Sequence, residues 1–558
     1  MLKLLATLAV ICGALPGVVA ADWSGTVRAD QDGDGRATAS EPPLEGVAVS
    51  NGREVVRTDA DGRYTLPERP GVFVKLTCPD DYACPQWYSL DGGDFALRPA
   101  PAADDFFFIQ LSDAHVMAEI ADFTRFSSPP IPWWLPQFAA DWLTLRFLDR
   151  GYAELTSDDI VNALREAVSP YSDVSGLSET GVFRAYSEEL GRPGSPLGDV
   201  RRQIREAFAE VGRLEPDFVI STGDLWLESN TATPEAVESW VAVYREASET
   251  AGVPFFNTIG NNEIAGFMND EFSASDPRYG KHYFRATYGP TAYSFDRGPF
   301  HFVALDTHRP DPTEDEPKAW DFNSMEPAIR DWVDADLAAH EGRGRVLVAL
   351  NHEPFHIDER WGYDDPYKAD DEGLFARHGV AYSLAGHTHR NGYDDGEATT
   401  HITTGAISGL RWTLPVAIHA RGYRLFYAKD GRLYSAWKNT DQPVLGFVTP
   451  VDPAAVPELH PGSKSPADKD ALVGEVRIVV VASDAKSPFA ELSLRLDGQP
   501  LSLERWGDYF AAATLDADAI PAEGATLELR ARGSDQADHS SSLRVGRPAN
   551  LAPGVALE

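Results

Sequence analysis

The chain has 558 residues and a formal net charge of −37, from 49 Lys and Arg against 86 Asp and Glu. A surface this negative repels phosphate backbones and anionic lipids, so no nucleic-acid-binding surface is expected. Apolar residues make up 43% of the chain, which excludes a disordered protein. The length predicts roughly two to four domains.

The N-terminus has the pattern of a signal peptide. Lys3 precedes the apolar stretch Leu4–Leu15, and Val18–Ala20 form a small-residue cleavage site. We therefore expect residues 1–20 to be removed and the protein to be secreted or periplasmic. A buried N-terminal helix is the alternative. The stretch is too short to span a bilayer, and no later segment is long and apolar enough, so no transmembrane anchor is expected.

Residues 22–102 are predicted to form a small β-sandwich. Short strand-like runs are separated by the turn dipeptides Asn51-Gly52 and Asp61-Gly62. Cys78 and Cys84 are the cysteines left after signal-peptide removal. An even pair in an exported chain predicts one disulfide, and two free thiols are the alternative.

An acidic segment at the start of this domain is spaced like a calcium loop. Asp30, Asp32, Asp34 and Glu41 stand where the oxygen ligands of the 12-residue loop stand. Two readings stay open, a structural calcium ion remote from catalysis and a plain acidic turn.

Between residues 103 and 440, apolar runs alternate with amphipathic helical stretches, which is typical of a layered α/β domain. One helix is expected to start at Thr233 and Pro234. Residues 117–198 are too long and too apolar for a loop, so we expect an inserted cap. Residues 466–548 return to strand-like runs and are predicted to form a second β-sandwich. The apolar runs are Phe106–Leu111, Phe218–Ser221, Phe255–Ile259, Phe302–Leu305, Val346–Leu350 and Val380–Leu384.

Five of these apolar runs are followed by side chains that bind metals. These side chains are Asp113, His115, Asp224, Asn261, His352, His387 and His389. Because functional crevices form at the carboxyl ends of strands in α/β sheets, we expect all seven at one rim. Imidazole and carboxylate ligands together suit Zn, Fe or Mn. Seven ligands are too many for one ion but suit two ions that share a bridging carboxylate.

This ordered set resembles the calcineurin-like metallophosphoesterase superfamily. The segments Tyr293–Asp296, His301–Asp306 and Gly405–Gly409 resemble its bacterial exported branch, which has accessory β-domains at both ends. The resemblance covers about residues 103–440 without the insertion. It implies a multidomain α/β protein with a two-sheet metallophosphoesterase sandwich flanked by helices and with small β-sandwich domains at both ends.

The resemblance also implies a role for each candidate ligand. One metal would be held by Asp113, His115 and His389, the other by Asn261, His352 and His387, with Asp224 bridging the two. Two divalent or trivalent transition-metal ions, Zn, Mn or Fe, would then activate a bridging hydroxide for attack on a phosphate ester.

One position departs from the family pattern. Where the family usually has a histidine that protonates the leaving group or holds the phosphate, this chain has Asn262. An amide cannot deliver a proton at neutral pH. We therefore expect a phosphodiesterase or pyrophosphatase that expels good leaving groups. Glu353 and His356 are candidate replacements for the missing acid.

Two other functions stay open. One is a phosphomonoesterase or nucleotidase with a different acid. The other is a non-catalytic, metal-containing surface module whose β-domains bind glycans or partners. The intact ligand set favours an enzyme that acts on a small phosphate ester, and no particular oligomeric state is predicted.

Overall fold

The structure of the protein is a computed structural model. It forms two compact units, Met1–Cys78 with Tyr82–Ala100, and Pro79–Asp81 with Pro101–Glu558. The predicted signal peptide lies outside the described residues, and so does the predicted cap apart from Met117 and Ala118. Every helix in the described part of the chain is too short or too polar to cross a bilayer. The described residues are 22–69, 71–118, 200–268, 272–312, 318–322, 324–355, 368–395, 399–409, 421–450, 475–484, 487–516, 520–521, 524–533 and 536–545.

The first unit is a β-sandwich of two four-stranded sheets, ordered β4-β1-β8-β6 and β3-β2-β5-β7. Alternate residues of β4 point inward, so Tyr64 and Leu66 join the buried core with Val27. Cys78 and Cys84 form the predicted disulfide, with their Cα atoms 5.9 Å apart. The strands are β1 Asp22–Ala29, β2 Ala48–Ser50, β3 Val55–Arg57, β4 Arg63–Pro67, β5 Val74–Leu76, β6 Tyr82–Ala83, β7 Tyr88–Ser89 and β8 Phe95–Pro99.

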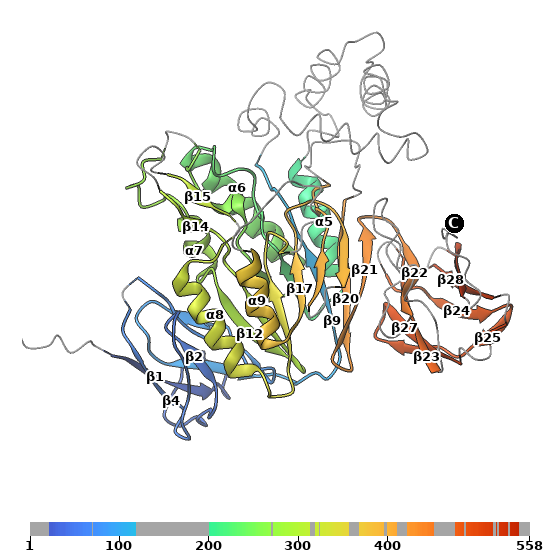
Figure 1. The fold of residues 1–558 in the computed structure, drawn as a ribbon, viewed down its shortest axis with the longest axis horizontal. Helices are drawn as coiled ribbons and strands as arrows, with labels where there is room; N and C mark the ends of the chain where they lie inside the picture. Colours follow the sequence, from blue (N-terminus) through green and yellow to red (C-terminus); the bar gives the residue numbers. More distant parts are fainter. Residues whose placement is uncertain are drawn as a thin grey trace, which may run out of the picture. The chain divides into compact units, whose positions relative to one another are not determined.

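Two facing sheets form the centre of the second unit (Figure 1). One has five strands in the order β11-β10-β9-β20-β21, and the other has six in the order β12-β13-β16-β17-β19-β18. Strands β9, β10 and β11 run parallel, and so do β13, β16, β17 and β19, so each set ends at one edge of its sheet. The strands are β9 Phe106–Leu111, β10 Phe218–Ser221, β11 Phe255–Asn257, β12 Tyr293–Arg297, β13 Phe300–Ala304, β16 Val346–Leu350, β17 Val380–Ala385, β18 Gly392–Asp395, β19 Thr400–Thr403, β20 Gly422–Lys429 and β21 Arg432–Asn439.

Phenylalanine rings fill the space between these two sheets. Phe108 on β9 stacks on Phe218 at 5.1 Å and on Phe426 at 4.7 Å, measured between ring centroids. The ring of Phe302, on the opposite sheet, meets Phe108 edge-on at 5.8 Å. Burial of these rings stabilises the face-to-face packing of the two sheets.

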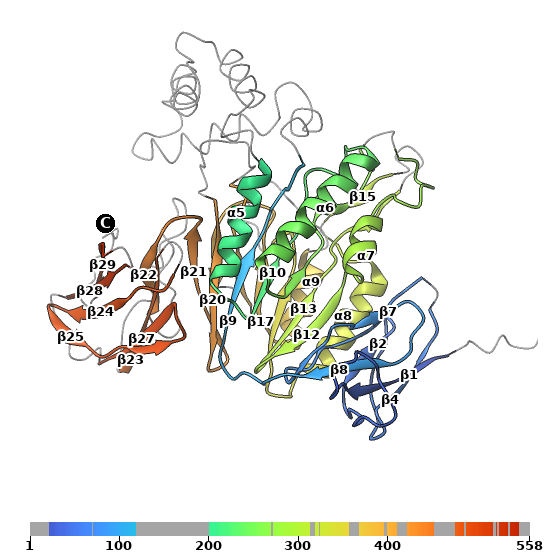
Figure 2. The same cartoon turned by 180° about the vertical axis from the view of Figure 1, so that it is seen from behind.

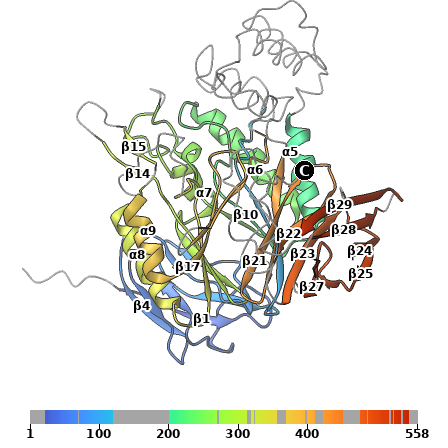
Figure 3. The same ribbon diagram turned by 45° about the vertical axis from the view of Figure 1, so that its right-hand side comes forward.

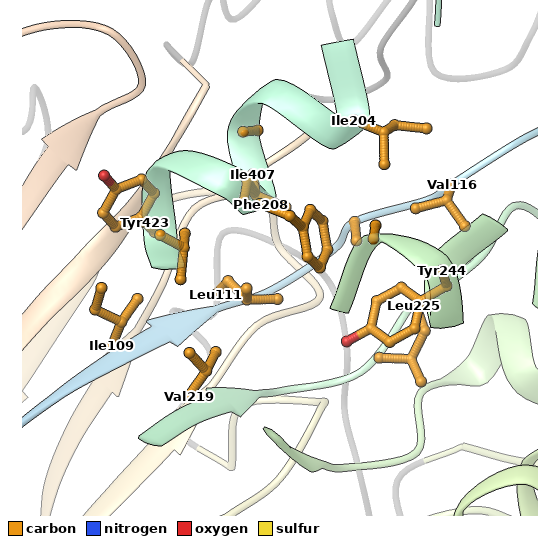
Figure 4. Packing of buried hydrophobic residues seen from close by; sticks show 14 of the residues in the cluster. Ile109, Leu111, Val116, Ile204, Phe208, Val219, Leu225, Tyr244, Ile407 and Tyr423 are labelled. Atoms are coloured by element: carbon orange, nitrogen blue, oxygen red, sulfur yellow. The ribbon is translucent and has the colours of Figure 1, made fainter. Parts of the chain in front are cut away.

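Helices cover the outer faces of both sheets. The helices α5 Val200–Arg213 and α6 Pro234–Ala251 lie against the five-stranded sheet (Figure 2). Their apolar sides share one core with β9 and β10, where Phe208 lies near Leu111 and Tyr244 lies near Leu225 (Figure 4). The α6 helix begins as predicted, because the Thr233 hydroxyl accepts a hydrogen bond from the Ala236 amide and Pro234 occupies the first turn.

Two further helices of this domain lie on the six-stranded sheet. The helices α8 Pro327–His340 and α9 Lys368–His378 lie side by side on it (Figure 3), and the short α7 spans His282–Tyr288. A two-sheet sandwich flanked by helices is the predicted fold class, which is confirmed. Three strands differ from their predicted bounds, because β11 ends at Asn257, β13 runs from Phe300 to Ala304 and β17 ends at Ala385.

Eight further strands in the described part of the chain form a second sandwich after this two-sheet domain. Its sheets are ordered β22-β23-β27-β26 and β25-β24-β28-β29. Trp506 and Phe510 belong to the same buried core as Tyr427 and Tyr434 of β20 and β21. The strands are β22 Val444–Pro450, β23 Glu475–Ser483, β24 Glu491–Leu496, β25 Gln499–Leu501, β26 Glu504–Trp506, β27 Phe510–Asp516, β28 Ala525–Arg532 and β29 Asp538–Val545.

Candidate metal centre

The seven predicted ligands follow the carboxyl ends of five parallel strands. Those strands are β9, β10 and β11 of one sheet and β16 and β17 of the other. The ligands are Asp113 and His115 after β9, Asp224 after β10, Asn261 after β11, His352 after β16, and His387 and His389 after β17. The side-chain atoms of these residues approach one another in two groups that share a single residue.

The first group consists of Asp113, His115, Asp224 and His389, whose ligand atoms lie within 4.8 Å of one another. The Nε2 atoms of His115 and His389 are 2.9 Å apart. His389 Nε2 is 3.3 Å from Asp113 Oδ1, and His115 Nε2 is 3.7 Å from Asp224 Oδ2. Two imidazoles and two carboxylates therefore face a common point.

The second group contains Asp224, His352 and His387. His352 Nε2 is 3.3 Å from Asp224 Oδ1. Asn261 completes the group, because its Oδ1 lies 3.1 Å from both His352 Nε2 and His387 Nδ1. Asp224 thus turns Oδ2 toward the first group and Oδ1 toward the second, which is what a bridging carboxylate requires.

The geometry of both groups fits metal ions. The four ligands of a tetrahedral zinc ion lie about 3.4 Å apart at bond lengths of about 2.1 Å, and the separations above cluster around that value. Asp113 Oδ1 is buried without a hydrogen-bond donor in the described part of the chain, as a metal ligand would be. His352 Nδ1 donates to the Thr222 carbonyl at 2.7 Å, which leaves its Nε2 lone pair facing the site.

The charges of the site are strongly coupled. Burial alone would raise the pKa of Asp224, but the adjacent His352 and His115 lower it well below its usual range. Burial would likewise raise the pKa of Asp113, and His389 lowers it. Both carboxyl groups are therefore ionised at neutral pH and present negative charge to a cation.

A buried glutamate joins the loops of two ligands. Glu263 accepts backbone N–H hydrogen bonds from Gly260 at 2.7 Å, Leu225 at 2.9 Å and Asp224 at 3.0 Å. Burial and the charge of Asp224 raise the pKa of Glu263 to about 8. Sequence reasoning gave this residue no role, although it directly follows Asn262 in the motif.

Five of the seven candidate ligands have a left-handed backbone, which non-glycine residues rarely adopt. Backbone hydrogen bonds hold this conformation, among them His115 N–H to Asp224 O at 2.9 Å. Conformations of this kind cost on the order of 1 kcal/mol each and cluster at functional sites. The φ angles are 52° at Asp113, 41° at His115, 51° at Asp224, 65° at His387 and 57° at His389.

Close packing explains the glycines of the ligand loops. A Cβ atom on Gly386 would lie 1.8 Å from Ser112 Oγ, and one on Gly260 would lie 2.4 Å from the Asp224 amide nitrogen. Gly260 itself has an ordinary extended backbone, with φ −114°. These two glycines are needed because neighbouring loops approach them too closely for a side chain.

Asn262 lies between the two ligand groups and is only 4% exposed. Its Nδ2 is 3.1 Å from His115 Nδ1, and its Oδ1 accepts a hydrogen bond from Asn261 Nδ2 at 3.1 Å. Its backbone N–H donates to Asp224 Oδ1 at 2.9 Å. The side chain is therefore occupied in holding one ligand of each group.

Glu353 is occupied elsewhere too. Its Oε2 accepts from the Thr307 hydroxyl at 2.6 Å, and its Oε1 lies 2.8 Å from His308 Nε2. Burial would raise the pKa of Glu353, but His308 lowers it, so this carboxyl group carries no proton for a leaving group at neutral pH. The other candidate acid, His356, lies outside the described residues.

The candidate calcium loop brings together three of its four acidic side chains. Oxygens of Asp30, Asp32 and Glu41 lie within 4.8 Å of one another, whereas Asp34 is not in this group. Asp30 Oδ1 accepts from the Gly33 amide at 2.7 Å. The loop's own N–H groups thus already satisfy part of the carboxylate oxygens.

Two segments of the chain match models of known protein families. Residues 197–391 match the family model for calcineurin-like phosphoesterase, and residues 31–91 match the model for the N-terminal domain of calcineurin-like phosphoesterase. No curated protein matches the chain. The fold and these matches define the class, which is metal-dependent phosphoesterase. Residues 197–391 belong to the calcineurin-like phosphoesterase family, and the family predicted from the ligand motifs is confirmed.

Several solved structures are similar to this chain. One is a dimetal phosphatase from Danio rerio, with 17% identity and a TM-score of 0.33, covering 43% of this chain and 86% of that one. Another is purple acid phosphatase from yellow lupin (Lupinus luteus) seeds, with 14% identity and a TM-score of 0.32, covering 71% of this chain and 67% of that one. Identities and scores of this size bear on neither substrate nor activity.

Proposed function

We propose that this protein is a dinuclear phosphodiesterase or pyrophosphatase that uses Zn, Mn or Fe. The observation that carries the proposal is Asp224, whose two carboxylate oxygens face two separate groups of ligand atoms. Asp113, His115 and His389 would complete one metal site. Asn261, His352 and His387 would complete the other.

When bound, two such cations would supply a water of lowered pKa and the positive charge that stabilises a phosphoryl transition state. The chain's own contribution is to hold the ligands. The ionised Asp113 and Asp224 attract the cations, and Thr222 fixes the ring of His352 by accepting its Nδ1–H.

The preference for good leaving groups rests on Asn262. Its amide carries no transferable proton, and its two ends already contact His115 and Asn261. A missing general acid costs about two to four powers of ten when the leaving group is a poor one. Aryl and phosphoryl leaving groups depart without that proton, so diesters of this kind and pyrophosphates remain good substrates.

Turnover of a bis-aryl phosphate and of a mono-alkyl phosphate tests this preference in wild type, Asn262→His and Asn262→Ala. We expect Asn262→His to raise the ratio of alkyl monoester turnover to diester turnover at least tenfold, whatever its effect on the diester rate through His115 and Asn261. Asn262→Ala is the control, because it removes the amide without adding an acid. An equal ratio in wild type and Asn262→His would refute the role of Asn262 and would favour the phosphomonoesterase alternative.

The metals are tested separately by elemental analysis of the purified protein. Two ions of Zn, Mn or Fe per chain are expected. A protein that binds two ions and hydrolyses none of these esters would support the non-catalytic surface module instead. A protein that stays metal-free when all three metals are offered would refute the proposed centre.

Two further proposals concern the exported state and the first unit. The disulfide of Cys78 and Cys84 supports secretion or a periplasmic location, where such bonds persist. Mass spectrometry of the mature protein should find an N-terminus just after Ala20. The structural calcium ion at Asp30, Asp32, Asp34 and Glu41 stays a prediction, and unchanged thermal stability of the first unit with and without Ca²⁺ would refute it.

A further inference from the structure

Gln110 is a polar residue in the space between the two sheets. Alternate residues of β9 point to the same face, and Phe106, Phe108 and Gln110 share the face that looks toward the six-stranded sheet. Phe106 and Phe108 contact the aromatic ring of Phe302 on that sheet. Gln110 is fully buried, at 0% exposure, at the end of the row nearest the ligands.

All polar atoms of the Gln110 side chain are hydrogen-bonded. Its Nε2 donates to Thr222 Oγ1 at 3.1 Å and to the Ala385 carbonyl at 3.0 Å. Its Oε1 accepts from the Thr404 hydroxyl at 2.8 Å. Thr222 follows β10 on the same sheet, whereas Ala385 and Thr404 belong to β17 and to the turn after β19 on the opposite sheet. The amide therefore links the two sheets.

Gln110 and two of its three partners lie close in sequence to candidate ligands. Gln110 itself precedes Asp113 by three residues, Thr222 precedes Asp224 by two, and Ala385 precedes His387 by two. The carbonyl of Thr222 also accepts the Nδ1–H of His352 at 2.7 Å. One buried amide thus touches the base of the loops that supply both metal groups.

We propose that Gln110 is a positioning residue that sets the spacing between the ligand loops of the two sheets. This inference rests on the proposed dinuclear centre. Apolar packing alone lets sheets slide by fractions of an ångström, whereas the two directional hydrogen bonds to Ala385 and Thr404, which cross between the sheets, fix their register. Gln110 Nε2 donates to the Ala385 carbonyl, so a glutamate at position 110 would place a carboxylate oxygen against that carbonyl oxygen.

Binding of Co²⁺ to the metal-free protein tests the proposal. Gln110→Met keeps the length of the side chain and removes its hydrogen bonds. Supporting groups around metal ligands typically change metal affinity by about 10–100-fold, and we expect a loss of that size with an altered Co²⁺ absorption spectrum. Thr222→Val, which removes one partner of Gln110 and preserves its shape, should act in the same direction and serves if Gln110→Met does not fold.

Tyr423→Phe is the matched control. It also removes a buried hydrogen bond of this domain, from the Tyr423 hydroxyl to Glu210 Oε1 at 2.6 Å, but its partner lies on helix α5 and not on a ligand loop. The control should lose stability and keep wild-type Co²⁺ affinity and spectrum. Wild-type Co²⁺ binding by Gln110→Met or Thr222→Val, or an equal loss in Tyr423→Phe, would overturn the positioning role. A wild type that binds fewer than two Co²⁺ ions would overturn the dinuclear centre instead.

Discussion

A buried imidazole on β13 should make the stability of the catalytic domain fall at alkaline pH. His301 is 0% exposed. Its Nδ1 lies 2.8 Å from Asp296 Oδ1, and its Nε2 lies 2.9 Å from Asp336 Oδ2. Its ring stacks on that of His340, with centroids 3.8 Å apart, and Arg345 pairs with Asp296. Both ring nitrogens thus face carboxylates, which requires the doubly protonated, charged form.

The size of the effect follows from these contacts. Burial alone would lower the pKa of His301, but the charges of Asp336 and Asp296 raise it to about 9. Relative to an ordinary histidine, this corresponds to about 3 kcal/mol of stabilisation. Because the pKa is higher in the folded state, the stabilisation is complete below about pH 6.5 and is lost as the pH rises through 9. The pKa of His340 is lowered by burial and by His301, so it stays neutral.

The assay is urea unfolding at pH 6, 8 and 10 for wild type and His301→Gln. The free energy of unfolding of the wild type should fall by about 3 kcal/mol more than that of the variant across this range. Phe300→Leu is the control, because it removes apolar contact from the same strand without changing a charge. Parallel pH curves for wild type and His301→Gln would refute the charged state of His301.

Three other predictions concern the metals and the packing of the domains. Chelation should lower the melting temperature, because ions that bind only the folded state stabilise it by about 2.7 kcal/mol at a hundred times their dissociation constant; an unchanged melting curve would contradict this. Gly386→Ala should lose metal content, since its Cβ would clash with Ser112 Oγ, whereas Gly373→Ala, where nothing lies within 4 Å, should keep it. Trp506→Ala should destabilise the catalytic domain by about 3–5 kcal/mol, because this ring of the second sandwich belongs to the core of that domain. Independent melting of the catalytic domain and the second sandwich in calorimetry would contradict this.

The positions of the candidate ligands at the ends of the strands were predictable because the signal is local. Each of the five apolar runs is a strand or overlaps one, and each ligand lies within a few residues of its end. The parallel strands β9 and β10 then bring Asp113 and Asp224 to the same edge of their sheet. The loops that carry them are joined by a hydrogen bond from Ser112 to Thr222, although 110 residues of sequence separate these two residues. The assignment of each candidate ligand to one of the two metals came from the resemblance of the motifs to the family.

Features that depend on tertiary contact were not predictable from the sequence. Nothing in the segment Gly422–Lys429 indicates that it pairs with β9 in antiparallel register, far from it in sequence. Gln110 reads as an ordinary strand residue, and only the approach of the second sheet gives it partners. The first strand of the second sandwich was not predicted either. β22 begins at Val444 and pairs with β23, whereas the sequence pattern placed the start of this sandwich at residue 466.

The left-handed backbone at five candidate ligands also limits how this protein can change over evolutionary time. Aspartate, asparagine, histidine and glycine tolerate such φ angles, whereas valine, isoleucine and other branched residues do not. A random substitution at Asp113 or His387 would therefore usually damage the loop as well as remove a ligand atom. Loss of catalysis by gradual drift is restricted to a few replacements, with asparagine foremost among them.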